Sequence, residues 1–472
     1  MNGHSKEASH MLQGRLNIAF VALTVALGGF LLGFDATVIS GVVPFIRDYF
    51  SLSGTSGDLK LGFAVSSLGW GAMAGNAIAG PLSDRFGRRS VLLGTALMFV
   101  LSSVLAATAT SFPSFVAARI VGGLAVGGAI LIAPVYIAEI APAEKRGSLV
   151  SLNQLMIVIG ISASFFSNFF LLDLGEHNWR YMLGVQMVPA MLYFTLLWLV
   201  PESPRWLLLK GRDEAALQVL RRVSGEQQAQ SNLQQIRQSL SMKAVSRGFR
   251  GLLDSRMRLI MTIALGLAFF QQITGINAIF YYLPTIFSQA GGGVDDAFRQ
   301  AVLVGVVNVA MTFVAIWLID KLGRKPLLIV GIVGMALSLF AIIWAISQES
   351  YNARLVLIAI IGFVASFAIS LGPVMWVLLS EIFPNEQRAA AISVAGFWNA
   401  LVSASVTMIF PSALSALGSG GTFLVFALFA TAALLFVVML VPETKGRTLE
   451  QLESELTTAK TDSQRASLTV TH

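Results

Sequence analysis

Long apolar segments, separated by short polar loops, follow one another along almost the whole chain. Each is about 20 residues or longer, which is the length that an α-helix needs to cross the hydrocarbon core of a bilayer. The pattern predicts twelve such helices, at residues 18–40, 61–82, 90–109, 115–138, 148–172, 180–200, 259–288, 300–320, 327–346, 355–383, 390–414 and 421–441. The sequence therefore predicts an all-α membrane protein with twelve transmembrane helices.

A polar stretch, residues 201–258, separates the sixth predicted span from the seventh. It contains helical periodicity at 212–223 and 233–240, so we expect a helical linker there. The predicted organisation is an N-terminal segment (1–17), an N-terminal six-helix half (18–200), the linker (201–258), a C-terminal six-helix half (259–441) and a C-terminal tail (442–472).

The composition agrees with a membrane protein. Hydrophobic residues make up 55% of the chain and charged residues only 12%, whereas soluble proteins carry about 25% charged residues. Residues 1–15 hold several charges and no small-residue cleavage site follows them, so the first span is expected to be retained. The absence of cysteine excludes disulfides and thiolate metal sites, and no metal or cofactor is predicted.

The net charge of +7 has a topological explanation. An even number of spans places both ends on one side, and most of the 32 lysine and arginine residues fall on that side. Only five fall on the other side: Arg47, Lys60, Arg180, Arg299 and Arg354. Because cytoplasmic loops are enriched in lysine and arginine, both termini and the linker are predicted to be cytoplasmic. We expect a multi-pass protein of a plasma or bacterial inner membrane, and no binding of nucleic acid.

Three loop motifs occur twice, about 240 residues apart. The string DRFGRR at 84–89 returns as DKLGRK at 320–325, and PESPR at 201–205 is echoed by PETKGR at 442–447. In addition, a glutamate stands seven residues before an arginine in both halves. Two repeated six-helix halves are typical of carriers that work by alternating access, with the substrate site between the halves.

Tight turns and membrane edges explain the glycines and basic residues of these loops, but they do not explain the acidic residues placed against them in both halves. We therefore predict a cytoplasmic gate of salt bridges that joins the halves and breaks during transport. Its members are Asp84, Arg88, Glu139, Arg146, Asp320, Arg324, Glu381 and Arg388.

Charge within the predicted spans is rare and therefore informative. Asp35 and Arg119 both lie about four to five residues below the outer ends of their spans, roughly 6–8 Å deep, so they can form an ion pair. One interpretation is a static pair, or two side chains that extend to the surface. The other is a proton site, because burial disfavours a charged carboxylate and a nearby arginine favours it. All four histidines lie outside the spans, so no histidine relay competes with this site.

The other intramembrane polar groups are mostly neutral amides, which both donate and accept hydrogen bonds and suit the hydroxyl groups of a substrate. Any single amide could instead join two helices. The run QQITGIN at 271–277 combines three amides with a mid-span glycine, where a helix can unwind beside a cavity. Gly372 and Pro373 are expected to interrupt the tenth span in the same way, just before Trp376.

Seven strings together resemble the sugar porter family of the major facilitator superfamily, which includes bacterial proton–sugar symporters and animal glucose facilitators. They are GPLSDRFGRR (80–89), RIVGG (119–123), PVYIAEIAPAEKRG (134–147), PESPRWL (201–207), QQITGINAIFYY (271–282), GPVMW (372–376) and PETKGRTLEQLE (442–453). The resemblance covers about residues 18 to 455. It implies the major facilitator fold, with two pseudo-symmetric six-helix halves and a cytoplasmic helical linker.

The resemblance also implies roles for particular residues. It places Asp35 where symporters carry aspartate and the animal facilitators typically carry asparagine, and it implies that Asp35 and Arg119 couple transport to protons. The family's sugar-contact positions fall on Gln154, Gln271, Gln272, Asn277, Asn308, Trp376 and Asn399. Two positions depart from the family pattern, because Leu32 replaces a usual aromatic residue and Ala400 replaces a frequent tryptophan.

The sequence thus predicts a secondary active transporter, a proton-coupled monosaccharide symporter, and not an enzyme. An uncoupled sugar facilitator is the nearest alternative, and Asp35 argues against it. A sugar sensor would be expected to carry a longer signalling tail than 456–472, and a drug-efflux carrier a more apolar cavity. The expected partners are a monosaccharide, protons and the lipid bilayer, with no obligate protein partner. Neither the particular sugar nor a preference for pentose or hexose follows from the sequence.

Overall fold

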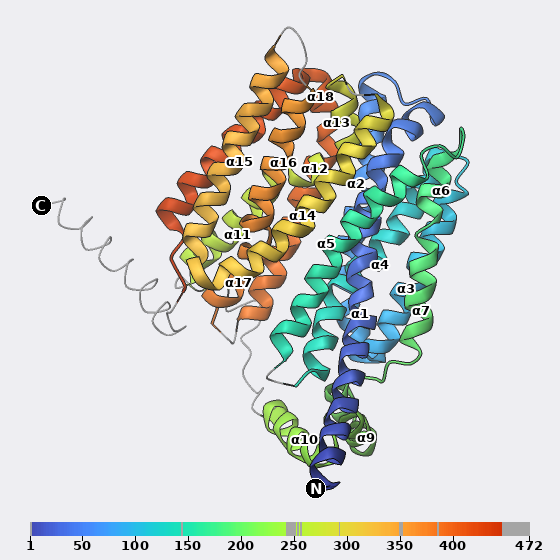
Figure 1. Cartoon of the computed structure of the whole chain (residues 1–472), viewed down its shortest axis with the longest axis vertical. Coiled ribbons are helices and arrows are strands. Elements are labelled where there is room, and N and C mark those ends of the chain that lie inside the picture. Colours follow the sequence, from blue (N-terminus) through green and yellow to red (C-terminus); the bar gives the residue numbers. More distant parts are fainter. Residues whose placement is uncertain are drawn as a thin grey trace, which may run out of the picture. The chain divides into compact units, whose positions relative to one another are not determined.

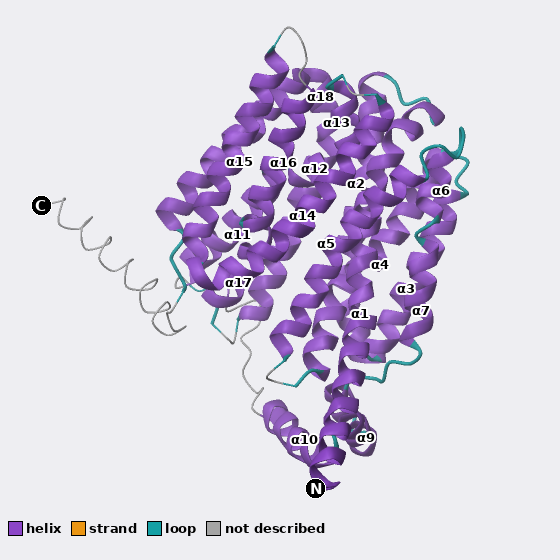
Figure 2. Ribbon diagram, viewed as in Figure 1, coloured by secondary structure: helices purple, strands orange, loops and turns teal. Residues whose placement is uncertain are grey.

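The computed structural model describes residues 2–142, 145–241, 252, 254, 257–291, 293–348, 353–384 and 387–445. Figure 2 shows only helices and loops in this described part. By its internal contacts the chain divides into two compact units. Unit 1 comprises Met1–Ala244, Tyr281–Thr285 and Ala297–Gly305, and unit 2 comprises Val245–Phe280, Ile286–Asp296 and Val306–His472.

Unit 1 is built mainly from the first ten helices, coloured blue to green in Figure 1. They are α1 (Asn2–Tyr49), α2 (Gly54–Phe86), α3 (Arg88–Ala107), α4 (Phe112–Ile140), α5 (Arg146–Phe170), α6 (Asn178–Gly184), α7 (Met187–Leu197), α8 (Pro204–Leu209), α9 (Asp213–Ser224) and α10 (Glu226–Ser241). Helix α4 packs against α2 and α3, while α1 packs against α5. Their shared core contains the fully buried rings of Phe99, Tyr136 and Tyr193.

Helices α9 and α10 lie within the predicted linker and pack against each other, and the linker's bounds of 201–258 stay a prediction. Helix α9 places Ala216, Leu220 and Val223 on one buried face. These apolar residues recur at the three- and four-residue spacing of a single helix face. The same periodicity that predicted a helix at 212–223 therefore also attaches that helix to the unit.

Unit 2 contains most of the remaining helices, coloured yellow-green to red in Figure 1. They are α11 (Arg258–Ile273), α12 (Ile276–Tyr281), α13 (Leu283–Gln289), α14 (Val294–Leu322), α15 (Arg324–Ser347), α16 (Ala353–Ile369), α17 (Leu371–Ile382) and α18 (Arg388–Leu440). Helix α15 packs against α16 and α18, and α11 packs against α18 and α17. Parts of α12, α13 and α14 belong by their contacts to unit 1.

Two helix breaks lie where the sequence predicted interruptions. Gly275 separates α11 from α12 with a φ of 91°, in the left-handed region that favours glycine, and a Cβ at this position would lie 2.5 Å from the Phe426 ring. The second break falls between α16 and α17 at Ser370, two residues before the expected Gly372. Pro373 explains this shift, because a proline ring clashes with the carbonyl four residues earlier, which is that of Ile369.

Nine helical segments in the described part are long and apolar enough to cross a bilayer. The difference from twelve has local causes. The sixth predicted span is divided into the short helices α6 and α7. The last two predicted spans are two helical segments that share the label α18 and meet at a kink, where Gly418 has a non-helical φ of 68°. Helix α2 covers the second predicted span but is not among the nine. The all-α membrane architecture is confirmed, and the exact count of twelve spans stays a prediction.

Candidate functional site

Asp35 on α1 and Arg119 on α4 form an ion pair in the interior of unit 1. Each side chain is only 1% exposed. Arg119 Nη1 donates to Asp35 Oδ1 at 2.5 Å, and Nη2 donates to the backbone carbonyl of Asp35 at 3.1 Å. Removing one member of a buried pair leaves the other charge uncompensated, which costs about 3–5 kcal/mol. The contact that the matching depths made possible is therefore present, and its role in proton coupling stays a prediction.

The second carboxylate oxygen of Asp35, Oδ2, takes no part in the ion pair. Oδ2 is buried and has no hydrogen-bond partner among the described residues. It faces a space that Gly122 leaves free, since a Cβ there would lie 2.8 Å from Oδ2 and 2.5 Å from Ser102 Oγ. Ser102 donates its own proton to the Ala118 carbonyl at 2.9 Å, which leaves its oxygen able to accept a hydrogen bond. A proton on Oδ2 would thus enter a small gap with a hydroxyl acceptor on its wall.

Four neutral amides of unit 2 form one hydrogen-bonded group, which we call the amide cluster: Gln271, Gln272, Asn277 and Asn399. Gln271 and Asn399 are 3% and 8% exposed, Gln272 is buried between them, and Asn277 is half-buried. Asn399 Nδ2 donates to Gln271 Oε1 at 2.8 Å, and Asn277 Nδ2 donates to Gln272 Oε1 at 2.8 Å. Helix α18 thereby contacts the end of α11, and Asn277 joins the two sides of the break that follows it.

The break between α16 and α17 also contributes to the amide cluster. Gln271 Nε2 donates to the Leu371 carbonyl at 2.8 Å and to the Gly372 carbonyl at 3.3 Å, both in the first turn of α17. Beyond this turn, the Trp376 ring lies beside Gly396 of α18, one turn before Asn399. The two predicted interruptions thus supply both the amides and the carbonyl groups that orient them.

The other predicted sugar-contact residues lie outside this hydrogen-bonded group. Gln154 on α5 is exposed within unit 1, and the Asn308 side chain on α14 is buried in unit 2. The Trp376 ring is 38% exposed. Sequence reasoning missed Ser403, whose oxygen accepts from Asn277 Nδ2 at 2.7 Å. Its one sequence signal is the spacing of four residues after Asn399, which places both on the same face of α18.

At the start of α3, Arg88 is the centre of a polar group that we call the unit 1 arginine cluster: Arg88, Glu139, Glu202 and Ser203. Arg88 Nε donates to Glu139 Oε2 at 3.0 Å, and the Ser203 hydroxyl donates to the same oxygen at 2.5 Å. Glu202 Oε1 accepts from the backbone N–H of Arg88 at 3.0 Å and so caps the helix. Gly87, with a φ of 99°, makes room for this cap, because its Cβ would lie 2.2 Å from Glu202.

The start of α15 repeats this arrangement as the unit 2 arginine cluster: Arg324, Glu381, Glu443 and Thr444. Arg324 Nη2 donates to Glu381 Oε1 at 2.7 Å, and the Thr444 hydroxyl donates to Glu381 Oε2 at 2.5 Å. Glu443 accepts from the backbone N–H groups of Arg324 and Lys325, each at 3.0 Å. Partial burial raises the pKa of Glu443, but hydrogen bonds from backbone N–H groups, led by that of Lys445, outweigh it and lower the net pKa.

The ion pairs of the predicted gate that the structure describes therefore lie within each unit. Arg88 also contacts Asp84 at 3.2 Å, and Arg388 donates to the Phe383 carbonyl at 3.2 and 3.3 Å. The side chains of Arg146 and Asp320 lie outside the described residues. Sequence reasoning missed the helix-capping role of Glu202 and Glu443, although the echo of PESPR in PETKGR contained both. A salt-bridge set that joins the halves stays a prediction.

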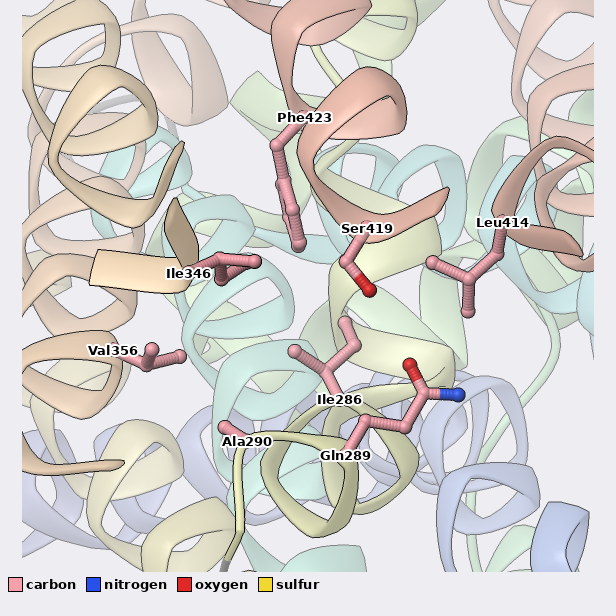
Figure 3. A pocket seen from close by; sticks show the side chains of 8 residues that line it. All are labelled: Ile286, Gln289, Ala290, Ile346, Val356, Leu414, Ser419 and Phe423. Carbon is pink, nitrogen blue, oxygen red and sulfur yellow. The ribbon is translucent and has the colours of Figure 1, made fainter. Parts of the chain in front are cut away.

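Figure 3 shows a small hollow elsewhere in unit 2. The residues that line it come from α13, α15, α16 and α18: Ile286, Gln289, Ala290, Ile346, Val356, Leu414, Ser419 and Phe423. Only two of these side chains are polar, and none belongs to the amide cluster. The hollow therefore lacks the hydrogen-bonding groups that a polyhydroxylated ligand needs.

Known proteins resemble the chain over nearly its full length. The family model described as "Sugar (and other) transporter" matches residues 21–456. The arabinose–proton symporter of Bacillus subtilis is 38% identical over 442 residues, which cover 92% of this chain and 94% of that protein. The D-xylose–proton symporter of Escherichia coli is 39% identical over 474 residues, with coverages of 92% and 94%.

Solved structures agree with this similarity. An inward-open conformation of the xylose transporter XylE from Escherichia coli matches with a TM-score of 0.82 and 37% identity, covering 93% of this chain and 99% of that one. The proton:xylose symporter XylE bound to 6-bromo-6-deoxy-D-glucose matches with a TM-score of 0.76, 37% identity and the same coverages. The chain is therefore a multi-pass membrane transporter, and not an enzyme, and it belongs to the sugar porter family of the major facilitator superfamily.

Proposed function

We propose that the protein is a proton-coupled monosaccharide symporter that works by alternating access. The observation that carries this proposal is the Asp35–Arg119 pair, a buried carboxylate with one oxygen held by a guanidinium and the other unpartnered among the described residues. A carboxylate that gains or loses its arginine partner changes its affinity for a proton. Transport steps that alter this contact would load and release one proton in each cycle.

The amide cluster supplies the sugar-binding part of the proposal. Its members are neutral, so it suits a neutral polyhydroxylated ligand better than an ion. The Trp376 ring, 38% exposed near Gly396, offers a flat apolar face of the kind that packs against a sugar ring. Gln154 on α5 and Asn308 on α14 are further proposed sugar contacts. Relatives named as arabinose–proton and D-xylose–proton symporters support the substrate class.

The arginine clusters are proposed to act at the cytoplasmic gate. They stand at the starts of α3 and α15, in the loops that carry the basic residues of the positive-inside pattern. The same pattern supports a cell-membrane orientation in which both termini are cytoplasmic. Each cluster holds a loop by hydrogen bonds to a helix start, so a rocking movement of one half can be transmitted to its gate residues.

Uptake into proteoliposomes tests the proposal. Purified wild-type protein is reconstituted into liposomes. The uptake of radiolabelled L-arabinose, D-xylose and D-glucose is followed with and without an imposed pH gradient that is acidic outside. We expect at least one sugar to accumulate above equilibrium when the gradient is present, and a protonophore to abolish the excess.

Two results would contradict the proposal in different ways. Uptake that reaches the same equilibrium with and without the gradient would identify a facilitator and overturn the coupling. Uptake or binding of none of a broad panel of monosaccharides would overturn sugar transport itself. Protein-free liposomes under the same gradient provide the control for leakage.

A further inference from the structure

The hydrogen bonds of the amide cluster have a fixed direction, and two backbone carbonyls set it. A carbonyl oxygen only accepts, so the group that faces it has to be an amide nitrogen. Gln271 Nε2 faces the Leu371 carbonyl at 2.8 Å, and Asn399 Nδ2 faces the Ala268 carbonyl at 2.9 Å. The orientation of these two amides therefore follows from the backbone around them.

The orientation of Gln271 and Asn399 then determines the orientation of Gln272 and Asn277. With Gln271 and Asn399 fixed, their oxygens point toward Gln272, whose Nε2 donates to both, at 3.2 and 3.1 Å. Gln272 Oε1 consequently faces Asn277 Nδ2, at 2.8 Å. The second N–H of Asn277 is directed at Ser403 Oγ, at 2.7 Å. Reversing any one amide would place two oxygens or two nitrogens against each other.

This arrangement uses every donor of the four amides. Each amide nitrogen carries two N–H groups, and each nitrogen contacts two oxygens. The acceptors are not exhausted, because an amide oxygen has two lone pairs. Within the described residues, Asn277 Oδ1 receives no hydrogen bond, and the oxygens of Gln272 and Asn399 receive one each.

The one amide oxygen that receives no hydrogen bond, Asn277 Oδ1, lies at the more accessible end of the cluster. Gln271 and Asn399 form its buried end, whereas Asn277 and Ser403 are half-buried. A ligand that reaches the four amides therefore meets the oxygen of Asn277 and no free amide N–H group. The adjacent Ser403 hydroxyl accepts from Asn277 and keeps its own O–H as a donor.

We propose that the amide cluster recognises its substrate as a set of hydrogen-bond acceptors, so that a sugar hydroxyl bound to one of the four amides must donate its proton. This inference rests on the proposed sugar-binding function and specifies its chemistry. Ser403 acts in it as a positioning residue, because its oxygen occupies the N–H group of Asn277 that would otherwise be free to donate.

Sugar analogues separate donation from acceptance. A deoxy sugar lacks both functions at one carbon, while a deoxyfluoro sugar keeps a weak acceptor and cannot donate. Binding of D-glucose and D-xylose is measured on the purified full chain by calorimetry, beside their mono-deoxy and mono-deoxyfluoro analogues. At one ring position or more, we expect the fluoro analogue to bind as weakly as the deoxy analogue. The expected loss is roughly 5- to 150-fold, the usual effect of leaving a buried polar group unpaired.

Variants tie the affected position to the cluster. Asn277→Ala should remove the difference in affinity between the parent sugar and its fluoro analogue at that ring position. Ser403→Ala should reduce this difference, because it frees an N–H group of Asn277. Ser403→Thr keeps the hydroxyl and should behave as the wild type. Gln289→Ala, outside the cluster in the hollow of Figure 3, should change nothing.

Each other outcome overturns a defined claim. If the parent sugars bind and the fluoro analogues match them wherever the deoxy analogues fail, the cluster donates and this inference is wrong. If no deoxy analogue loses affinity, the cluster does not recognise the sugar hydroxyl groups through hydrogen bonds at all. If neither these parent sugars nor any other monosaccharide binds, the proposed function fails together with the inference.

Discussion

The polar interiors of the two units differ in kind. Unit 1 buries a full charge and its counter-charge, with one carboxylate oxygen left open. Unit 2 holds four neutral amides, three of them buried and one half-buried, whose donors are all satisfied. A buried charge is costly unless it is paired, whereas neutral amides need only hydrogen bonds. A group that must gain and lose a proton therefore suits unit 1, and a group that must hold a ligand of fixed shape suits unit 2.

The starts of α3 and α15, by contrast, are alike in the two units. The two arginine clusters repeat each other, with an arginine at a helix start, a glutamate that pairs with it and a second glutamate that caps the helix. The repeat has thus kept the same chemistry at the proposed gates and holds different chemistry at the centres. This contrast is what we expect if both halves move by similar contacts while each performs a separate task.

The largest expected effect is the loss of coupling in Asp35→Asn. Asparagine keeps an oxygen for Arg119 but cannot titrate, so uphill accumulation driven by a pH gradient should disappear. Sugar binding and counterflow should persist, because they need no net movement of protons. The measurement is accumulation with an imposed gradient, compared with counterflow without one.

Asp58→Asn is the matched control for this variant. Asp58 is a second buried carboxylate of unit 1 and pairs with Arg47, and its asparagine variant should still accumulate sugar. Accumulation by Asp35→Asn would remove the coupling role from unit 1. Failure of both variants to a similar degree would mean that buried charge in general is needed, and not this pair in particular.

The second effect is a loss of affinity in Gln272→Ala. This side chain makes three hydrogen bonds inside the amide cluster. Its removal leaves the Asn399 oxygen and one N–H group of Asn277 unpaired, and the Gln271 oxygen keeps only its bond from Asn399. We expect sugar binding to weaken by about 1–3 kcal/mol, roughly 5- to 150-fold, while any remaining uptake still responds to the pH gradient. Calorimetry against the wild type measures the first effect and proteoliposome uptake the second.

Gln289→Ala, a glutamine of unit 2 outside the cluster, is the control for Gln272→Ala and should keep wild-type affinity. Unchanged affinity in Gln272→Ala would count against the assignment of sugar binding to the amide cluster. Normal affinity together with a lost pH response would place coupling in unit 2 and so reverse the comparison.

The sequence was sufficient for the all-α membrane architecture and for the Asp35–Arg119 contact, for clear physical reasons. Apolar runs of spanning length are hard to satisfy in any other fold, and charge within a span is rare enough to suggest its own partner. The helix break near Gly275 was also predictable, because a glycine beside polar residues is unusual in mid-span. The break at Ser370 was displaced by two residues because proline acts on the residue four positions before it.

The direction of the hydrogen bonds within the amide cluster could not be predicted. Its direction depends on carbonyls of Ala268 and Leu371, and Leu371 is 100 residues from Gln271 in the chain. No sequence pattern states which carbonyl a buried amide will meet. Ser403 gave no distinctive signal either, because serine is common in packed membrane helices. Likewise, the acidic residues of the loops suggested gate pairs, but the capping by Glu202 and Glu443 required the folded geometry.

The smallest expected effect on sugar binding comes from the arginine clusters. Arg88→Ala and Arg324→Ala should each lower the rate of transport and leave the affinity for sugar nearly unchanged.

The two variants should differ in the stability of the folded protein. The side chains of Arg88 and Glu139 are each 9% exposed, whereas Arg324 is 12% and Glu381 is 29% exposed. Water can solvate Glu381 after its partner is removed, but it reaches Glu139 less easily. Arg88→Ala should therefore lower the melting temperature more, with a cost approaching the 3–5 kcal/mol typical of a broken buried pair.

Thermal unfolding, calorimetry and counterflow on the same preparations test this last prediction. Arg85→Ala changes an exposed arginine of the same motif and should match the wild type in all three measurements. Loss of sugar binding as complete as in Gln272→Ala would show that the arginine clusters support the binding site and are not gates. A larger drop in melting temperature for Arg324→Ala would contradict the burial argument, because the more exposed glutamate should tolerate isolation better. Equal drops would mean that the helix caps formed by Glu202 and Glu443, and not the ion pairs, hold the two loops in place.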